Sequence, residues 1–280
     1  MNDIPNVTLN NGVQMPQLGL GVFLMPSDIT ADNVAAAIQN GYRLIDTAAM
    51  YGNETAVGEG IRKSGVPREQ LFITTKLWNS DHGFDNVAKA FETSMQKLGL
   101  EYLDLYLMHW PHPARGQMVE TWKAMEQLYK GGRIKSIGVC NFQPHHLDEL
   151  LQKSETVPAV LQIELHPTFT QEAVRAYAKR YGIQVESWAP LGGQKSIADL
   201  LGNLTLVDIA KKYSKTSAQV VLRWHIQQGL VVIPKSDHVS RIIENRDIFD
   251  FELTSDELAA ISDLNTGVRL GPDPDAFDRE

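Results

Sequence analysis

Cysteine is almost absent from this chain of 280 residues, since Cys140 is the only one. No disulfide can form within the chain, and no zinc site can be built from several cysteines. Long apolar runs are also missing, because no window holds the roughly 18 uninterrupted apolar residues of a membrane span. Residues 1–16 lack the basic and apolar segments of a secretory signal. We therefore expect a cytoplasmic protein that does not enter a membrane.

Positive charge and nucleotide-binding signatures are scarce as well. The formal net charge is −8 and no stretch is basic, so neither nucleic acid nor an anionic membrane is expected as a partner. Gly19 and Gly21 are followed by Leu24 where the dinucleotide fingerprint needs a third glycine, and no Walker-type phosphate loop occurs. No metal-binding motif is found, and His145 and His146 are expected to begin a helix and to face solvent.

What the chain does contain is a repeated alternation of apolar runs and amphipathic stretches. The runs are residues 17–21, 43–46, 71–76, 103–109, 134–140, 159–164, 184–188 and 230–234. Helical patterns lie near residues 30–40, 54–64, 84–98, 118–130, 144–153, 171–181, 204–228 and 239–247. Continuous apolar strands indicate a parallel sheet that is covered on its outer face. No linker or low-complexity segment divides the chain.

The pattern predicts an α/β protein with one domain over residues 1–280, a (β/α)8 TIM barrel, for which about 250 residues are typical. Residues 1–15 are expected to form an N-terminal β-hairpin around an Asn-Gly turn. Residues 266–280, rich in Gly, Pro and Asp, are expected to form a C-terminal loop tail that crosses one end of the barrel.

Four residues in the first 110 positions point to proton transfer. Asp46, Lys76 and His109 end three consecutive predicted strands, and Tyr51 lies in the loop after Asp46, so all four belong on the rim where barrels keep their chemistry. A tyrosine acid with a reference pKa of about 10 needs a nearby cation such as Lys76, which Asp46 would keep charged. His109 would orient the oxygen being protonated. Each residue alone is more often an ordinary loop residue, but together they favour a proton-donor site.

Two further clusters suit a nucleotide, although each has an ordinary alternative. Lys235, Ser236 and Arg241 follow the eighth strand, where barrels often bind phosphate, but they also fit a helix with surface cations. Asn141 and Gln162, near the ends of the fifth and sixth strands, match a carboxamide, yet Asn141 also fits a helix cap. The other rim residues, which also fit core or loop positions, are Cys140, Glu164, His166 and Trp188.

Read together, these motifs resemble the aldo-keto reductase family, most closely the branch of 2,5-diketo-D-gluconate reductases and related bacterial carbonyl reductases. The resemblance runs from about Pro16 to Phe277 and rests on LGLGVF, DTAAMYGNE, TTKLW, MHWP, IGVCNF, QIELHP, ESWAPLG, IPKSD with RIIEN, and the GPDPD tail. It implies NADPH-dependent reduction of aldehydes, ketones, dicarbonyls or keto sugars, with NADPH/NADP+ bound without a Rossmann fold. Since no extended apolar helix suggests an obligate interface, we expect a monomer whose partner is a small carbonyl substrate.

The resemblance also implies a role for each site residue. The catalytic residues are Asp46, Tyr51, Lys76 and His109, with Tyr51 as general acid. The cofactor residues are Gly21, Val22, Asp46, Cys140, Asn141, Gln162, Trp188, Leu191, Lys235, Ser236, Arg241, Glu244 and Asn245. The substrate pocket would be formed by Phe23, Trp78, His109, Trp110 and the tail. No metal ion is implied.

Three positions depart from the family pattern. Cys140 replaces the usual serine, so one carboxamide contact would be weaker. Asp237 places an anion next to the presumed phosphate site and opposes an NADPH preference, although Lys235 and Arg241 should outweigh it. Gly193, with Gln194 one position later, changes a loop that normally contacts pyrophosphate.

Two other functions fit part of the pattern. An aldolase-like barrel would use Lys76 to form a Schiff base, although pairing with Asp46 argues against it. A non-catalytic barrel that binds a dinucleotide for regulation would not need all four residues of the proton-donor site.

Overall fold

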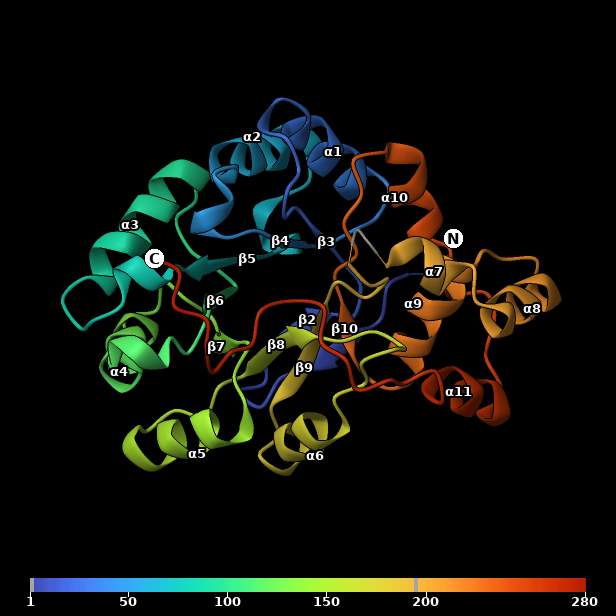
Figure 1. The fold of residues 1–280 in the computed structure, drawn as a ribbon. Helices are drawn as coiled ribbons and strands as arrows, with labels where there is room; N and C mark the ends of the chain where they lie inside the picture. Colours follow the sequence, from blue (N-terminus) through green and yellow to red (C-terminus); the bar gives the residue numbers. More distant parts are fainter. Residues whose placement is uncertain (1–2, 194–195) are drawn as a thin grey trace.

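The chain folds into a closed barrel of parallel strands surrounded by helices (Figure 1). The computed structural model describes residues 3–193 and 196–280. The barrel strands are β3 (Gly19–Gly21), β4 (Leu44–Asp46), β5 (Phe72–Leu77), β6 (Leu105–Met108), β7 (Ile137–Cys140), β8 (Val160–Glu164), β9 (Gln184–Trp188) and β10 (Val231–Val232). They pair in chain order from β3 to β10. The predicted (β/α)8 architecture is confirmed.

The first and last strands meet and close the barrel. Leu18 and Val232 form a parallel bridge, and the Val232 amide donates to the Gln17 carbonyl at 2.9 Å. Gly21 makes this close approach possible, since a Cβ atom there would lie 2.9 Å from the Ile233 carbonyl oxygen. Closure brings the carboxyl ends of all eight strands to one rim.

The outer layer consists of helices that alternate with the strands. They are α1 (Ser27–Gln39), α2 (Glu54–Ser64), α3 (Val87–Leu98), α4 (Met118–Lys130), α5 (Pro144–Lys153), α6 (Glu172–Arg180), α7 (Ile197–Leu201), α8 (Leu204–Tyr213), α9 (Ser217–Gln227), α10 (Val239–Arg246) and α11 (Ser255–Ser262). Their apolar faces pack on the sheet in one large core. Among the described residues, no helix has both the length and the apolar character that crossing a membrane requires.

Three helical segments differ from the sequence-based expectation. The single helix expected over residues 204–228 is two helices, because Ser214 has a φ of 55° and Thr216 caps a new helix with Gln219. Helices α7 and α11 were not anticipated. Helix α7 has only 5 residues, which is too short to show a helical period. Helix α11 begins with the capping box Thr254–Glu257, but the sequence after it is only weakly amphipathic.

The two ends of the chain cover opposite ends of the barrel. Strands β1 (Asn6–Thr8) and β2 (Gln14–Pro16) form the expected antiparallel hairpin. Leu9 and Met15 of this segment join the apolar cluster inside the barrel, which seals the amino-terminal end. Beyond α11, the C-terminal tail crosses the other end of the barrel, seen as the red trace in Figure 1. The carboxyl ends of the strands therefore lie beneath the tail.

Candidate active site

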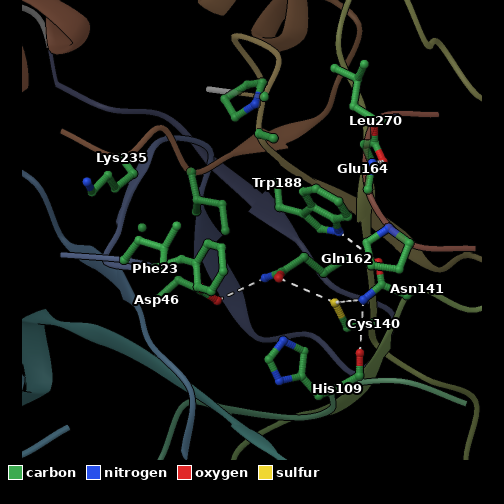
Figure 2. A pocket seen from close by; sticks show the side chains of 18 of the residues that line it. Phe23, Asp46, His109, Cys140, Asn141, Gln162, Glu164, Trp188, Lys235 and Leu270 are labelled. Atoms are coloured by element: carbon green, nitrogen blue, oxygen red, sulfur yellow. Dashed lines mark hydrogen bonds between the residues drawn. The ribbon is translucent and has the colours of Figure 1, made fainter. Parts of the chain in front are cut away.

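A cavity of about 550 Å³ opens at the carboxyl ends of the barrel strands (Figure 2). The predicted residues that line it are Gly21, Phe23, Asp46, Tyr51, Trp78, His109, Trp110, Cys140, Asn141, Gln162, Trp188, Leu191 and Lys235. The remaining predicted residues lie outside this lining; Val22 and Lys76 are buried, and Ser236, Arg241, Glu244 and Asn245 lie beyond Lys235 on the loop and helix α10.

Lys76 joins a carboxylate and a phenol at the base of the cavity. Its Nζ atom donates to Asp46 Oδ1 at 2.5 Å, to the Thr47 carbonyl at 3.0 Å and to Tyr51 Oη at 3.3 Å. Asp46 ends β4 and Lys76 lies on β5, so neighbouring strands bring this pair together. The short helix η1 (Ala49–Tyr51) turns the tyrosine toward them.

The loop that carries Tyr51 is held from beneath by a residue that the sequence did not single out. Asn53 is buried. Its Oδ1 atom accepts a hydrogen bond from the Thr47 hydroxyl at 2.9 Å, and its Nδ2 atom donates one to the Val22 carbonyl at 2.9 Å. These contacts tie the loop after β4 to the loop after β3. The only sequence signal was the Asn in the stretch YGNE, which is equally common in exposed turns.

Burial is the largest influence on the pKa of the Tyr51 phenol. Desolvation raises the pKa of the phenol, and the Lys76 ammonium opposes this by lowering the same pKa. The net direction is upward, whereas the sequence led us to expect that Lys76 would lower the pKa of the phenol. Tyr51 is therefore fully protonated at neutral pH, as a proton donor must be.

Lys76 keeps its charge despite being fully buried. Desolvation alone lowers the pKa of its ammonium, but the negative charge of Asp46 and its hydrogen bond raise that pKa by more, so the net direction is upward. A Schiff-base lysine needs a neutral amine. The ion pair with Asp46 therefore disfavours the aldolase-like alternative.

His109 stands beside Tyr51 as a neutral ring. It follows β6 and packs edge-on against Tyr51 and Trp78, with ring centroids 5.7 and 5.2 Å away. Burial lowers the pKa of the imidazole well below its usual value, and the charge of Lys76 lowers it further. A neutral imidazole carries one N–H, so it can donate a hydrogen bond to a substrate oxygen without competing as an acid.

A chain of hydrogen bonds joins the polar residues on the other side of the cavity (Figure 2). Gln162 Nε2 donates to Asp46 Oδ2 at 2.9 Å, and Cys140 Sγ lies 3.5 Å from Gln162 Oε1. Asn141 Nδ2 donates to the His109 carbonyl at 3.0 Å and lies 3.1 Å from Cys140 Sγ, while Trp188 Nε1 donates to Asn141 Oδ1 at 2.8 Å. The cysteine thus takes part in this network.

Asn141 has a left-handed backbone, with a φ of 64°. Asparagine tolerates this conformation better than most residues. The residue does not cap α5, because Gln143 is the N-cap there. The backbone geometry instead turns the Asn141 side chain into the cavity, where it lies among the lining residues.

Of the three residues expected to bind phosphate, Lys235, Ser236 and Arg241, only Lys235 lines the cavity. Lys235 lines the cavity, but its Nζ atom is paired with Asp237 Oδ2 at 2.7 Å. Ser236 bonds within its own turn, through the backbone of His238. Arg241 is exposed on α10, so its guanidinium is open to an anion. Asp237, which the sequence placed near the presumed phosphate, therefore pairs directly with Lys235.

The tail forms one wall of the cavity and is held at separate points. Glu164 accepts the backbone N–H groups of Leu270 and Gly271 at 2.7 and 2.9 Å. Further along, Phe277 packs against Trp110 with ring centroids 4.2 Å apart. Glu164, which sequence reasoning left as an ordinary rim residue, is thus an anchor for the tail.

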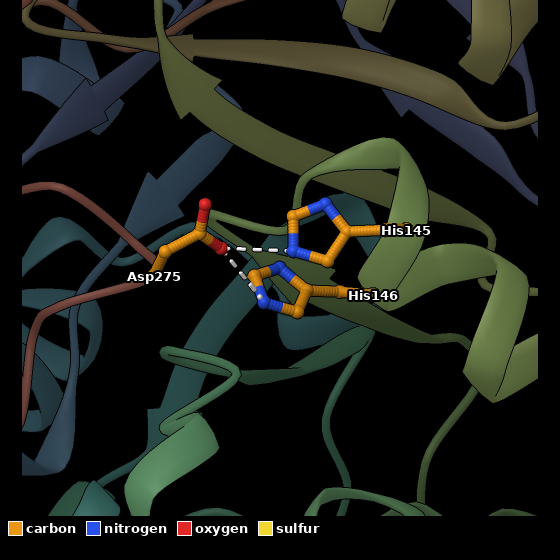
Figure 3. Close-up of side chains that lie close together, drawn as sticks. All are labelled: His145, His146 and Asp275. Carbon is orange, nitrogen blue, oxygen red and sulfur yellow. Dashed lines mark hydrogen bonds and ion pairs between the residues drawn. The ribbon is translucent and has the colours of Figure 1, made fainter.

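A second anchor is formed by His145 and His146 at the start of α5 (Figure 3). Their Nε2 atoms lie 2.9 and 3.1 Å from Asp275 Oδ1. The expectation that both histidines face solvent is wrong for His146, which is buried, because the tail lies over it. Its Nδ1 atom accepts the Gln143 N–H, so Nε2 carries the hydrogen and donates to Asp275. Hydrogen bonding thus accounts for this cluster without a metal ion.

The tail, which the resemblance assigns to the substrate pocket, contributes Leu270, Gly271, Pro272, Phe277 and Arg279 to the cavity wall, and Glu164 and Gly193 line it as well. The cavity residues that the sequence did not single out are Leu24, Met50, Ala189, Pro190, Gly192, Ile197, Ile233 and Pro234. Most are apolar or glycine, and such residues look the same in a core, a turn or a pocket wall. Gln194 lies outside the described residues, so its predicted contact has no counterpart here.

Comparison with known proteins places this site in a family. Residues 18–266 match the model of the aldo/keto reductase family. The chain belongs to this family. It is 54% identical over 271 residues to a glyoxal reductase from Bacillus subtilis, covering 96% of both chains. It is 51% identical to the methylglyoxal reductase DkgA from Escherichia coli, covering 97% of both chains.

Solved aldo-keto reductase structures with bound cofactor have the same fold. A mutant of Gox0644 in complex with NADPH superposes with a TM-score of 0.93, at 45% identity and with 99% of both chains covered. An aldo-keto reductase from Bombyx mori in complex with NADP gives a TM-score of 0.91 at 38% identity, with 98% of this chain and 97% of that chain covered. As an aldo-keto reductase, this protein is an NADPH-dependent oxidoreductase that acts on carbonyl groups.

The residues of this aldo-keto reductase fit such a cofactor. Asn141 and Gln162 place amide oxygens in the cavity wall beside Trp188, an arrangement suited to a carboxamide next to a flat ring. Lys235 in the cavity wall and Arg241, exposed on α10 outside that wall, offer cations that suit a phosphate. The amide, aromatic and cationic groups that such a cofactor needs are therefore present in or beside one cavity.

Proposed function

We propose that this aldo-keto reductase reduces small aldehydes, ketones and α-dicarbonyl compounds, with Tyr51 as the general acid. The arrangement that carries the proposal is the Lys76 ammonium in contact with both Asp46 and Tyr51, beside the neutral His109 ring. Support for small dicarbonyl substrates comes from the glyoxal and methylglyoxal reductases among the relatives. Phe23, which lies with its ring centroid 4.9 Å from that of Tyr51, suits substrates with some apolar surface.

Each residue of the site has a separate task. NADPH, when bound, supplies the hydride. His109 donates a hydrogen bond that holds the carbonyl oxygen near Tyr51, and Tyr51 transfers its phenolic proton to that oxygen as negative charge develops on it. Lys76 stabilises the phenolate that is left, and Asp46 keeps Lys76 protonated. Trp78 and Trp110 exclude water from the reacting centre.

We further propose that the protein acts as a monomer with a single domain. In support, the strands of the barrel form one sheet, and the catalytic and cofactor groups all come from the same chain. No residue of a second copy is needed to complete the cavity described here.

The general-acid role of Tyr51 is tested by the substitution Tyr51→Phe. Removing the hydroxyl should lower kcat by about 10²- to 10⁴-fold, the usual contribution of a positioned acid. Binding of NADPH should change little, because Tyr51 contacts the reacting oxygen. The measurements are NADPH consumption with glyoxal, methylglyoxal and simple aldehydes, and NADPH affinity by fluorescence titration.

Tyr42→Phe is the matched control, since the Tyr42 hydroxyl is buried and donates to the Ile242 carbonyl away from the cavity. Turnover of the Tyr51→Phe protein at the wild-type rate would exclude Tyr51 as the acid. Wild-type protein that binds NADPH but reduces no member of the panel would instead refute the proposed substrate class.

A further inference from the structure

The interior of the barrel holds a second carboxyl group below the catalytic pair. Glu186 lies on β9, is fully buried and is absent from the cavity wall. Its Oε2 atom accepts a hydrogen bond from Gln162 Nε2 at 2.7 Å, and the same nitrogen donates to Asp46 Oδ2 at 2.9 Å. One amide group therefore joins two carboxyl groups, and each takes one of its two hydrogens.

The charges around this amide allow only one of the two carboxyl groups to be ionised easily. Among the described residues, the cation in hydrogen-bond contact with the group is Lys76, and it contacts Asp46 rather than Glu186. Glu186 Oε1 is buried and has no hydrogen-bond partner in the described part of the chain. An unpartnered oxygen costs far more free energy on a buried carboxylate than on a neutral acid. The proton therefore resides on Glu186, and Asp46 is the anion.

We propose that Glu186 is a positioning residue: as a neutral acid, it holds one N–H of Gln162 while Asp46 holds the other, so that the amide oxygen of Gln162 faces the cofactor pocket. The inference rests on the proposed function, because it concerns how this site receives the nicotinamide carboxamide. With both hydrogens engaged, Gln162 has only its oxygen left to offer. That oxygen lies near Cys140 Sγ and can accept an N–H from a bound carboxamide.

The surroundings of Glu186 agree with this protonation state. Burial raises the pKa of the Glu186 carboxyl to about 8, with the charge of Asp46 as the next cause. The titratable groups of the interior are Asp46 on β4, Lys76 on β5 and Cys140 on β7, with Tyr51 from η1 next to Lys76. The remaining neighbours are uncharged and are Gln162 on β8, Leu105 and Leu107 on β6, and Val231 on β10. Lys76 is the cation of this set, and it is already paired.

A consequence follows for the two forms of the cofactor. Ionisation of Glu186 above pH 8 places a second anion beneath the pocket, where it attracts the positively charged ring of NADP+ but not the neutral ring of NADPH. The ratio Kd(NADP+)/Kd(NADPH) should therefore fall as the pH rises. Ionisation of the phosphate groups is the same in both forms and cancels in this ratio.

The test compares wild type with Glu186→Gln, which matches the neutral acid in size, keeps one acceptor oxygen and cannot ionise. Kd values for NADPH and NADP+ are measured by tryptophan fluorescence at pH 6.5 and pH 9. In wild type the ratio should fall by roughly fivefold to tenfold, as expected for one unit charge that acts across a partly screened interior. In Glu186→Gln it should stay constant. The control is Glu54→Gln, which alters a buried glutamate of α2 that accepts a hydrogen bond from Thr75 of β5. The ratio in this variant should change with pH as it does in wild type.

A ratio that stays constant in wild type, or that falls equally in Glu186→Gln, would overturn the inference while leaving the reductase function intact. Failure of wild type to bind either cofactor form at any pH would overturn the proposed function, and this inference with it. Glu186→Leu gives an independent readout, since loss of the acceptor frees Gln162 to rotate. Binding of both forms should then weaken at every pH, and unchanged affinity in that variant would also count against the inference.

Discussion

At the scale of single residues, the site is governed by which charges are paired and which are free. Lys76 is held by Asp46 in the barrel interior, so its charge serves Tyr51 and not an outside ligand. Lys235 is likewise held by Asp237, at 2.7 Å. Arg241 is exposed, and no ion pair holds it among the described residues, so it can meet a phosphate. The preference for NADPH over NADH should therefore depend more on Arg241 than on Lys235.

Replacing Arg241 by Gln should lower the preference for NADPH by about tenfold or more, because hydrogen bonds to a charged group contribute about 1.5–3 kcal/mol. Asp237→Asn should act in the opposite direction, since it releases Lys235 for the phosphate. The measurement is kcat/KM for NADPH and for NADH in each variant. An Arg241→Gln protein with the wild-type preference would show that the phosphate lies elsewhere.

At the scale of elements, the tail is the part of the fold that closes the site. It is not a strand or a helix, and its position depends on hydrogen bonds to the barrel rim. Glu164 at the end of β8 holds its first part, and the start of α5 holds Asp275. Gly271 is required for the close contact, because a Cβ atom there would lie 2.6 Å from the Trp188 ring.

Loss of the Asp275 anchor should weaken substrate binding more than cofactor binding. Asp275→Ala should raise the KM for a small dicarbonyl by about twofold to fivefold, the range expected for loss of a partly exposed polar contact, because Phe277 is then less firmly placed. The Kd for NADPH should stay near that of wild type.

The measurements are steady-state kinetics and a fluorescence titration, with Asp278→Ala as control at an exposed position of the same tail. Equal KM values for Asp275→Ala and wild type would show that the tail is placed without this anchor.

At the scale of the whole molecule, the closed barrel buries histidines that must stay neutral. Burial lowers the pKa of His82 to about 3, with His112 as the next cause, and neither ring nitrogen has a partner among the described residues. In the unfolded chain the same ring binds a proton below a pKa of about 6.5. The unfolded state therefore binds more protons, and the free energy of unfolding falls as the pH drops below about 6.5 and continues to fall toward pH 3.

Removing this histidine should make the protein less sensitive to acid. Between pH 7 and pH 5, the contribution of His82 to the free energy of unfolding should fall by up to about 2 kcal/mol, at about 1.4 kcal/mol per pH unit below 6.5. His82→Leu should lack that part of the pH dependence.

Urea denaturation of wild type and variant at pH 7, 6 and 5 measures the difference, and His238→Leu, at an exposed position, is the control. Parallel pH dependence in wild type and His82→Leu would mean that His82 can take up a proton in the folded state.

Much of the barrel and its rim was predictable because the relevant patterns are local. Apolar runs and turn residues mark the strands, and the residue that ends a strand is placed on the rim by chain geometry alone. Asp46, Lys76 and His109 could be grouped in this way before any contact was known. Helix α7 and the break at Ser214 could not, since a helix of 5 residues carries too little periodicity and a positive φ at serine leaves no mark in the sequence.

The sequence by itself therefore determined the order of strands and helices, the rim residues and the family, because these follow from spacing and from motifs within a few residues. Only the tertiary structure decided which partners those residues have. The contacts of Gln162 with both Asp46 and Glu186, and of His146 with Asp275, join positions 116, 24 and 129 residues apart. Burial likewise reversed the expected direction of the Tyr51 pKa. Distances across a closed barrel and exclusion of water are properties of the packed molecule, and no local pattern contains them.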